Sequence, residues 1–184
     1  YRGDWQGETL TFETASGELT VQRLNDALCV EFPSVPMAAI DHLAAVEQAL
    51  GVDVMSMHQP EENAWQMVCE LANQAAVEAC DPDFSALAEA TALGVAVTAK
   101  GDTHDFVSRF FIPQLGINED PVTGSAHCQL TPFWAAKLGK SRLVARQLSS
   151  RGGDLTCELK GNRVQLSGNC SLFAEGVLHL PSAE

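Results

Sequence analysis

Positive charge is scarce in this sequence. Its 184 residues include 11 Lys and Arg against 24 Asp and Glu, which gives a formal net charge of −13. The few basic residues form no run or stripe along the chain, whereas nucleic-acid binders draw most of their affinity from Lys and Arg on phosphates. The composition therefore argues against a nucleic-acid partner. An acidic substrate would have to be held locally, by a few Arg side chains or by backbone N–H groups.

Paired cysteines and long apolar runs are also missing. The six cysteines are scattered, without a C-x-x-C pair or a histidine at ligand spacing. This pattern disfavours a metal site and favours reduced, mostly buried thiols. No apolar run approaches the ~18 residues of a membrane-spanning helix, and the N-terminal YRGDWQGETL resembles neither a signal nor a transit peptide. We therefore expect a cytoplasmic protein without a membrane partner.

What is present is an ordinary globular composition, 46% hydrophobic and 19% charged. A chain of this length suits one large domain or two small lobes. Many short strands and a few helices, without strict β-α-β alternation, predict an α+β fold. The expected strands are 9–14, 19–23, 28–32, 65–71, 95–99, 106–112, 155–160, 163–167 and 172–180, and the expected helices are 37–50, 75–80, 84–93 and 125–138. Residues 52–63 are expected to form an exposed loop.

Residues 119–134 read EDPVTGSAHCQLTPFW. Apolar residues on nearly every side of the helix at 125–138 predict that it is buried all round, with a kink or junction at Pro132. Ser125 suits the N-cap or the first turn, and Gly124 lets another group approach the backbone closely.

The start of this helix is a candidate binding site for an anion. Its first N–H groups lack partners inside the helix, and the helix dipole adds partial positive charge. A carboxylate or phosphate could occupy that position without any lysine, and Asp120 would face the same pocket. The alternative is purely structural: Asp120 and Pro121 begin a turn, Ser125 caps the helix, and nothing binds.

The stretch at 97–140, VTAKGDTHDFVSRFFIPQLGINEDPVTGSAHCQLTPFWAAKLGK, closely resembles the phenazine-biosynthesis PhzF-like family. The similarity continues through residues 146–155 (RQLSSRGGDL) and 164–170 (VQLSGNC). It also reaches back, more weakly, to residues 12–21 (FETASGELTV). The resemblance implies a diaminopimelate-epimerase-like fold, in which two similar lobes each wrap a β-roll around a central helix. The helix at 125–138 would be the central helix of the second lobe. Residues 1–30 would be a remnant of the first lobe and 31–184 the second lobe, with the last strand returning towards the first.

The same resemblance implies an isomerase without a metal or organic cofactor. Its family chemistry is a proton shift on a dihydro-hydroxyanthranilate, with one carboxylic acid as general acid and base. Asp120 and Ser125 match residues that line the substrate cleft, and Gly124 would offer its backbone N–H to a small carboxylate-bearing substrate. Relatives suggest a homodimer.

The resemblance also indicates what these residues do not supply. The family's catalytic Glu and a facing Gly-His pair belong to the part of the first lobe that would precede Tyr1. The sequence does not open on Met. We therefore expect an incomplete form that is inactive alone.

Other interpretations remain open. The same fold hosts cysteine-type racemases and epimerases, but Cys128 lies about one turn inside the helix, where packing as a small apolar residue is favoured. A non-catalytic ligand-binding lobe is a further alternative. Arg109 is expected to pair with an acid such as Glu119, although it could instead reach a substrate carboxylate. Packing is favoured for His127, which could also touch the cleft. Arg151 is expected in a turn before the hairpin, from which it could reach the cleft mouth.

Overall fold

A computed structural model describes residues 9–14, 17–24, 27–60 and 65–177 of the chain. Its strands form one mixed sheet in the order β1-β2-β3-β12-β11-β10-β8-β7-β6-β5-β4, and β9 pairs with β8 outside this path. The strands are β1 (Thr9–Thr14), β2 (Gly17–Leu24), β3 (Ala27–Pro33), β4 (Ala38–Ile40), β5 (Ser56–Gln59), β6 (Gln66–Glu70), β7 (Gly94–Ala99), β8 (Phe106–Ile112), β9 (Ile117–Asp120), β10 (Arg142–Gln147), β11 (Gly153–Lys160) and β12 (Arg163–Gly168). The helices are α1 (Ala44–Leu50), α2 (Gln74–Ala79), α3 (Phe84–Ala90) and α4 (Gly124–Leu138), with a 3-10 turn at Pro113–Leu115.

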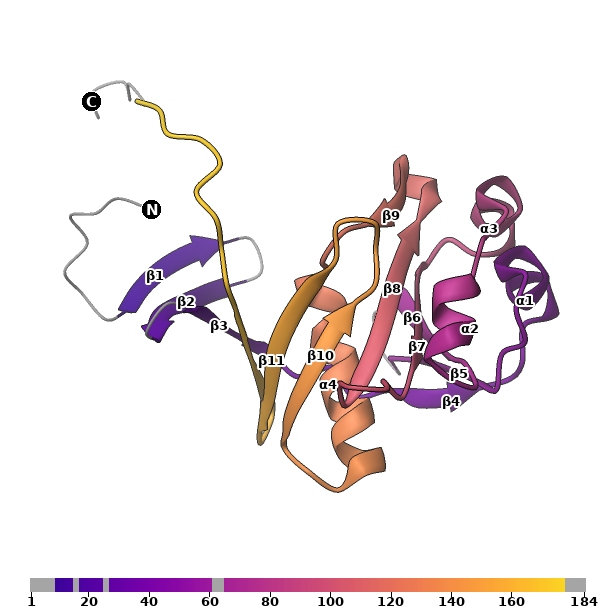
Figure 1. Cartoon of the computed structure of the whole chain (residues 1–184), viewed down its shortest axis with the longest axis horizontal. Helices are drawn as coiled ribbons and strands as arrows, with labels where there is room; N and C mark the ends of the chain where they lie inside the picture. The colour runs from indigo at the N-terminus through magenta and orange to yellow at the C-terminus, as the bar shows by residue number, and fades with distance from the viewer. Residues whose placement is uncertain (1–8, 15–16, 25–26, 61–64, 178–184) are drawn as a thin grey trace.

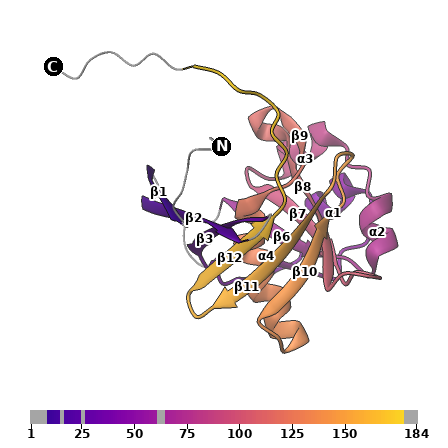
Figure 2. The same ribbon diagram turned by 60° about the vertical axis from the view of Figure 1, so that its left-hand side comes forward.

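The sheet curves around α4 (Figures 1 and 2). This helix contacts β6 on one side and β10, β11 and β12 on the other. Its Trp134 ring stacks on Phe106 of β8, with 5.9 Å between ring centroids. The Trp134 indole N–H donates to the Thr98 hydroxyl of β7 over 2.9 Å. The expected α+β fold with a central helix is therefore confirmed, and α4 is buried except at its C-terminal end, where Ala136 and Lys137 are exposed.

The strands β6, β7 and β8 are covered on both faces. Every residue of β7 is buried. Its Val95 and Val97 belong to the core that includes α1, α2 and α3, whereas Ala96 belongs to the core around α4. Since successive side chains of a strand point to opposite faces, the two cores lie on either side of the same strands. This double burial explains why these segments read as continuous apolar runs.

Two local features hold the ends of these elements. Asp83 is the N-cap of α3, and its carboxylate accepts hydrogen bonds from the backbone N–H groups of Ser85 and Ala86. The Gly161-Asn162 turn joins β11 to β12, with Gly161 at a φ of 61°, which a residue without Cβ adopts easily.

Four predictions about elements are wrong. Residues 38–40 form β4, and only 44–50 are helical, because pairing with β5 overrides the weak helical pattern of 37–50. The same pairing places β5 inside the expected loop at 52–63. The helix expected at 84–93 ends at Ala90, and Gly94 instead begins β7, where a Cβ would lie 2.5 Å from the Phe110 ring. Residues 172–177 form no strand, and 178–180 lie outside the described residues.

Besides β4 and β5, two strands were not predicted, β9 and β10. β10 (Arg142–Gln147) pairs parallel with β8 and antiparallel with β11. β3 pairs with both β2 and β12, so the sheet continues across residue 30, and the assignment of residues 1–30 to another lobe stays a prediction. None of the described helices has the length and apolarity that a membrane crossing requires.

Candidate active site

The candidate site lies where β9 ends and α4 begins. Asp120 is the last residue of β9 and pairs with Phe110 of β8. After Pro121 and Val122, Thr123 is the N-cap of α4, and Gly124 and Ser125 are its first two helical residues. The predicted cap was therefore placed two residues late, but Ser125 does lie in the first turn. The structure thus brings Asp120, Gly124 and Ser125 together at one helix start.

A buried hydrogen-bond network holds this segment. The Thr123 hydroxyl donates to Asp120 Oδ2. The Gln147 amide, at the end of β10, accepts from the Thr123 N–H over 2.8 Å. Its Nε2 donates to the Asp120 carbonyl over 2.7 Å and to Thr123 Oγ1 over 3.1 Å. Gln147 is 0% exposed, so its amide orientation is fixed by these contacts rather than by solvent.

The first turn of α4 keeps hydrogen-bond donors available. No side chain caps this helix, and within the described part of the chain no acceptor is recorded for the N–H groups of Gly124 and Ser125 or for the Ser125 hydroxyl. Both residues are half-buried, and a Cβ on Gly124 would meet nothing within 4 Å. With the positive end of the helix dipole, these donors suit a carboxylate.

The other side of the first turn is anchored in the core. His127 is 0% exposed, and its Nδ1 lies 2.7 Å from the Thr123 carbonyl. Because a carbonyl only accepts, Nδ1 carries the proton, while Nε2 has no hydrogen-bond partner. Burial lowers the pKa of His127, against a smaller opposing effect of the Thr123 carbonyl. The packing interpretation of His127 is therefore confirmed, with a neutral imidazole.

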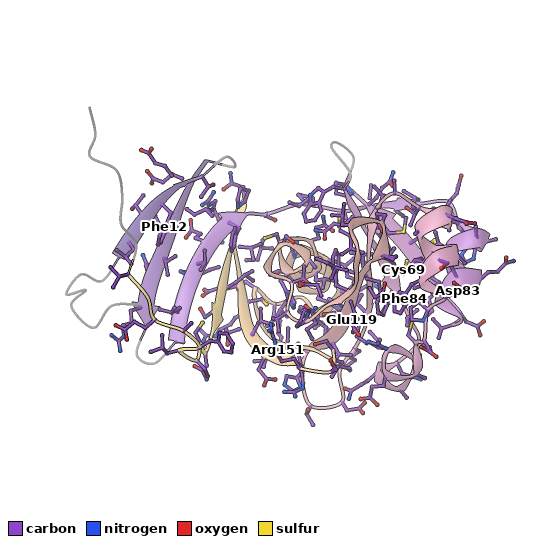
Figure 3. The ribbon with its side chains drawn as sticks, turned by 90° about the horizontal axis from the view of Figure 1, so that it is seen from above. Phe12, Cys69, Asp83, Phe84, Glu119 and Arg151 are labelled. Atoms are coloured by element: carbon purple, nitrogen blue, oxygen red, sulfur yellow. The ribbon has the colours of Figure 1, made fainter. Side chains whose placement is uncertain are left out.

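The loop between β10 and β11 closes over the segment from Asp120 to Thr123. The Ser149 hydroxyl donates to the Pro121 carbonyl over 2.7 Å and accepts from the Gly152 N–H over 3.0 Å. A Cβ on Gly153, the first residue of β11 after the loop, would lie 2.5 Å from Val122 Cγ2, so the backbone at the end of the loop packs directly on this segment. Figure 3 shows Arg151 of this loop on the same side of the molecule as Glu119. Arg151 is exposed in this turn.

Arg109 makes structural contacts, as expected. Its guanidinium forms two hydrogen bonds with Glu119, of 2.7 and 3.1 Å, and a further one of 2.5 Å to the Cys80 carbonyl after α2. The hydrogen bonds to Glu119 raise the pKa of Arg109, against the opposing effect of burial. This arginine ties β8 to β9 and to the end of α2.

Cys128 is unsuited to thiolate chemistry in this structure. The residue is 6% exposed, and burial raises the pKa of its thiol to about 12. Its Sγ lies 3.6 Å from the Gly124 carbonyl, inside the helix. Cysteine-based racemisation needs a thiolate near neutral pH, so the geometry weighs against that alternative.

Sequence reasoning missed three polar residues that hold the site. Gln147 lies on the unpredicted strand β10, 27 residues after Asp120. Gln66 of β6 is fully buried and donates to the Ser125 carbonyl over 3.1 Å. Thr123 lies inside the quoted motif, but nothing in the sequence shows that its hydroxyl turns to Asp120. The sequence around a buried glutamine does not indicate its hydrogen-bond partner, because that partner is set by how the strands pair.

A separate depression lies at the opposite end of α4. Its volume is about 330 Å³, it is open to solvent, and it is lined by Pro132, Ala135, Ala136, Gly139, Lys140, Ser141 and Leu159. The lining is mostly apolar and holds none of the groups described above. The shape of the surface therefore does not identify the start of α4 as a binding site. What identifies it is the Asp120 carboxylate beside the hydrogen-bond donors of Gly124 and Ser125.

Comparison with known sequences finds one family over most of the chain. The family described as phenazine biosynthesis-like protein matches residues 1–176. An uncharacterized isomerase of Pseudomonas aeruginosa is 45% identical over 180 residues, which cover 96% of this chain and 67% of that protein. The chain spans about two thirds of the length of the curated relatives it matches.

Comparison with solved structures agrees. A phenazine biosynthesis PhzF family protein of Enterococcus faecalis has a TM-score of 0.87 and 43% identity, covering 95% of this chain and 66% of that one. A predicted epimerase of Pseudomonas aeruginosa has a TM-score of 0.60 at 15% identity, covering 96% of this chain and 70% of that one. This second likeness shows the fold alone, and it is the epimerase-like fold that the sequence implied.

Proposed function

The chain belongs to the phenazine biosynthesis-like protein family, and we propose that it is the part of an isomerase that holds a small carboxylate-bearing substrate and shifts a proton on it by acid–base chemistry. The observation that carries this proposal is the pairing of a fixed carboxylate, Asp120, with uncapped N–H groups at the start of α4. Relatives described as uncharacterized isomerases support the reaction class.

Each residue has a chemical role in the proposal. The N–H groups of Gly124 and Ser125 and the Ser125 hydroxyl bind the substrate carboxylate. Asp120 Oδ2 is held by Thr123, so Oδ1 is the oxygen that accepts a hydrogen bond from a substrate hydroxyl or amine. This contact orients the substrate and relays protons at that substituent.

The acid that carries the proton between carbons is proposed to come from outside residues 1–184. Among the described residues, no second carboxylate hydrogen-bonds to the network of Asp120, Thr123 and Gln147. The acid takes a proton from one substrate carbon and returns one to another, so the reaction has no net proton change. We further propose that the protein works in the cytosol as a homodimer, without a cofactor.

The test measures deuterium incorporation from D2O into a dihydro-hydroxyanthranilate, with the complete natural polypeptide. Asp120→Asn should lower kcat by about 100-fold or more, the usual size of an acid–base contribution. Ser125→Ala should raise KM by about 10-fold, because it removes one hydrogen bond to a charged group. Residues 1–184 alone should incorporate no deuterium.

Matched controls separate these effects from general damage. Asp53→Asn and Ser85→Ala change exposed residues outside the site, Ser85 being in α3, and should leave both constants within about two-fold of wild type. Wild-type kinetics in Asp120→Asn and Ser125→Ala would refute both roles. Turnover by residues 1–184 would refute the external acid.

A further inference from the structure

The N-cap residue of α4 does not cap its helix. A threonine at this position normally accepts a hydrogen bond through its hydroxyl from the second or third helical N–H. Here Thr123 makes no side-chain cap contact, and its hydroxyl instead donates to Asp120 Oδ2. The usual capping oxygen is thus diverted to the carboxylate, which leaves the helix N–H groups uncapped.

Gln147 fixes the direction of that contact. Its Oε1 accepts the Thr123 N–H, so its Nε2 must face the other way, towards the Asp120 carbonyl and Thr123 Oγ1. Both Nε2 hydrogens are used by these two acceptors. Since Nε2 donates to Thr123 Oγ1, the single hydroxyl hydrogen of Thr123 is free to point at Asp120.

The result is a one-way chain of donors from Gln147 through Thr123 to Asp120. Chains of hydrogen bonds in a buried setting polarise one another and hold one geometry. Thr123 is 7% exposed and Gln147 is 0% exposed, so water does not compete for these contacts. The chain occupies Oδ2 and leaves Oδ1 of the same carboxylate for another partner.

We propose that Thr123 and Gln147 are positioning residues for the isomerisation. Their donor chain aims Asp120 Oδ1 at the substrate, and the same diversion of the Thr123 hydroxyl frees the N–H groups of Gly124 and Ser125 for the substrate carboxylate. This inference rests on the proposed function, because it assigns a task to Asp120 in that reaction.

Thr123→Val tests the chain, because it removes the hydroxyl and keeps the branched shape. In the D2O assay on the complete polypeptide, kcat should fall by about 10-fold or more while KM stays within about three-fold. Thr123→Ser keeps the hydroxyl and should restore kcat to within about three-fold of wild type. Thr131→Val is the matched control, since its hydroxyl donates to the His127 carbonyl in the same buried helix, and kcat should not change.

Gln147→Met gives an independent test of the same chain. It should lower kcat as Thr123→Val does, and the double variant should lose no more than the larger single loss, because both act through one hydroxyl. Fully additive losses would overturn the chain. So would wild-type kcat in Thr123→Val, or an equal kcat loss in Thr123→Ser.

Asp120→Asn, measured in the same series, distinguishes failure of the proposed function from failure of the positioning role alone. If it keeps wild-type activity, the proposed function fails. If it is inactive while Thr123→Val is unaffected, only the positioning role fails.

Discussion

At the scale of single residues, the site is defined by where hydrogen atoms point. Thr123 uses its backbone N–H, its hydroxyl and its carbonyl on three different partners. One partner, His127, lies in the core without solvent contact. The start of α4 is therefore held on its core side by the His127 imidazole, and burial in the fold disfavours the protonated form of that imidazole.

This burial predicts a loss of stability in mild acid. The pKa of His127 in the folded protein lies below its ordinary value of about 6.5. As the pH falls through 6.5, the unfolded chain therefore binds a proton at this residue that the folded chain does not bind. The stability due to the neutral form is fully present above this pH. It falls by up to about 1.4 kcal/mol between pH 7.5 and 5.5.

Urea unfolding at both pH values measures this effect. His127→Gln should remove about that much of the wild-type difference, whatever its own stability at pH 7.5. His58, whose pKa burial also lowers, adds a loss of the same sign, so the test compares variant with wild type. The exposed His42→Gln serves as control and should keep the loss. An unchanged pH dependence in His127→Gln would contradict the buried, neutral imidazole.

At the scale of elements, the site depends on close contact between the β10–β11 loop and the segment before α4. Gly153 permits this contact because it has no Cβ to meet Val122. Valine is stiff at χ1 and cannot easily turn its methyl groups away. The loop and the segment therefore form one packed unit at the end of the sheet.

Gly153→Ala should destabilise the protein by about 1–3 kcal/mol through overpacking. In a Val122→Ala background the same change should cost less than about 1 kcal/mol, since the clashing methyl groups are gone. Chemical denaturation of the four proteins in this cycle measures the coupling. Gly176→Ala, where a Cβ meets open space, is the control, and an equal cost of Gly153→Ala in both backgrounds would disprove the contact.

The elements also show what could be predicted from the sequence. Strands covered on both faces, such as β7, gave strong apolar runs and were predicted. β4 and β5 were missed because their strand character comes from pairing with each other. Asp120 and Ser125 are five residues apart and were predicted together, whereas Gln147 reaches Thr123 only through the unpredicted β10.

At the scale of the whole molecule, the curved sheet gives α4 two chemically different ends. The end at Gly124 carries a fixed carboxylate and uncapped donors, and the other end borders the mostly apolar depression. Figure 1 shows β9 and the β10–β11 loop at the same end of the sheet. The central claim is that a substrate carboxylate binds at the first of these ends.

The most direct test is an amide NMR titration of the ¹⁵N-labelled protein with 3-hydroxyanthranilate, a stable aromatic carboxylate. The account predicts saturable shifts that are largest at the N–H groups of Gly124 and Ser125. Shifts that are instead largest around Pro132 and Leu159, or no change at Gly124 and Ser125, would contradict it.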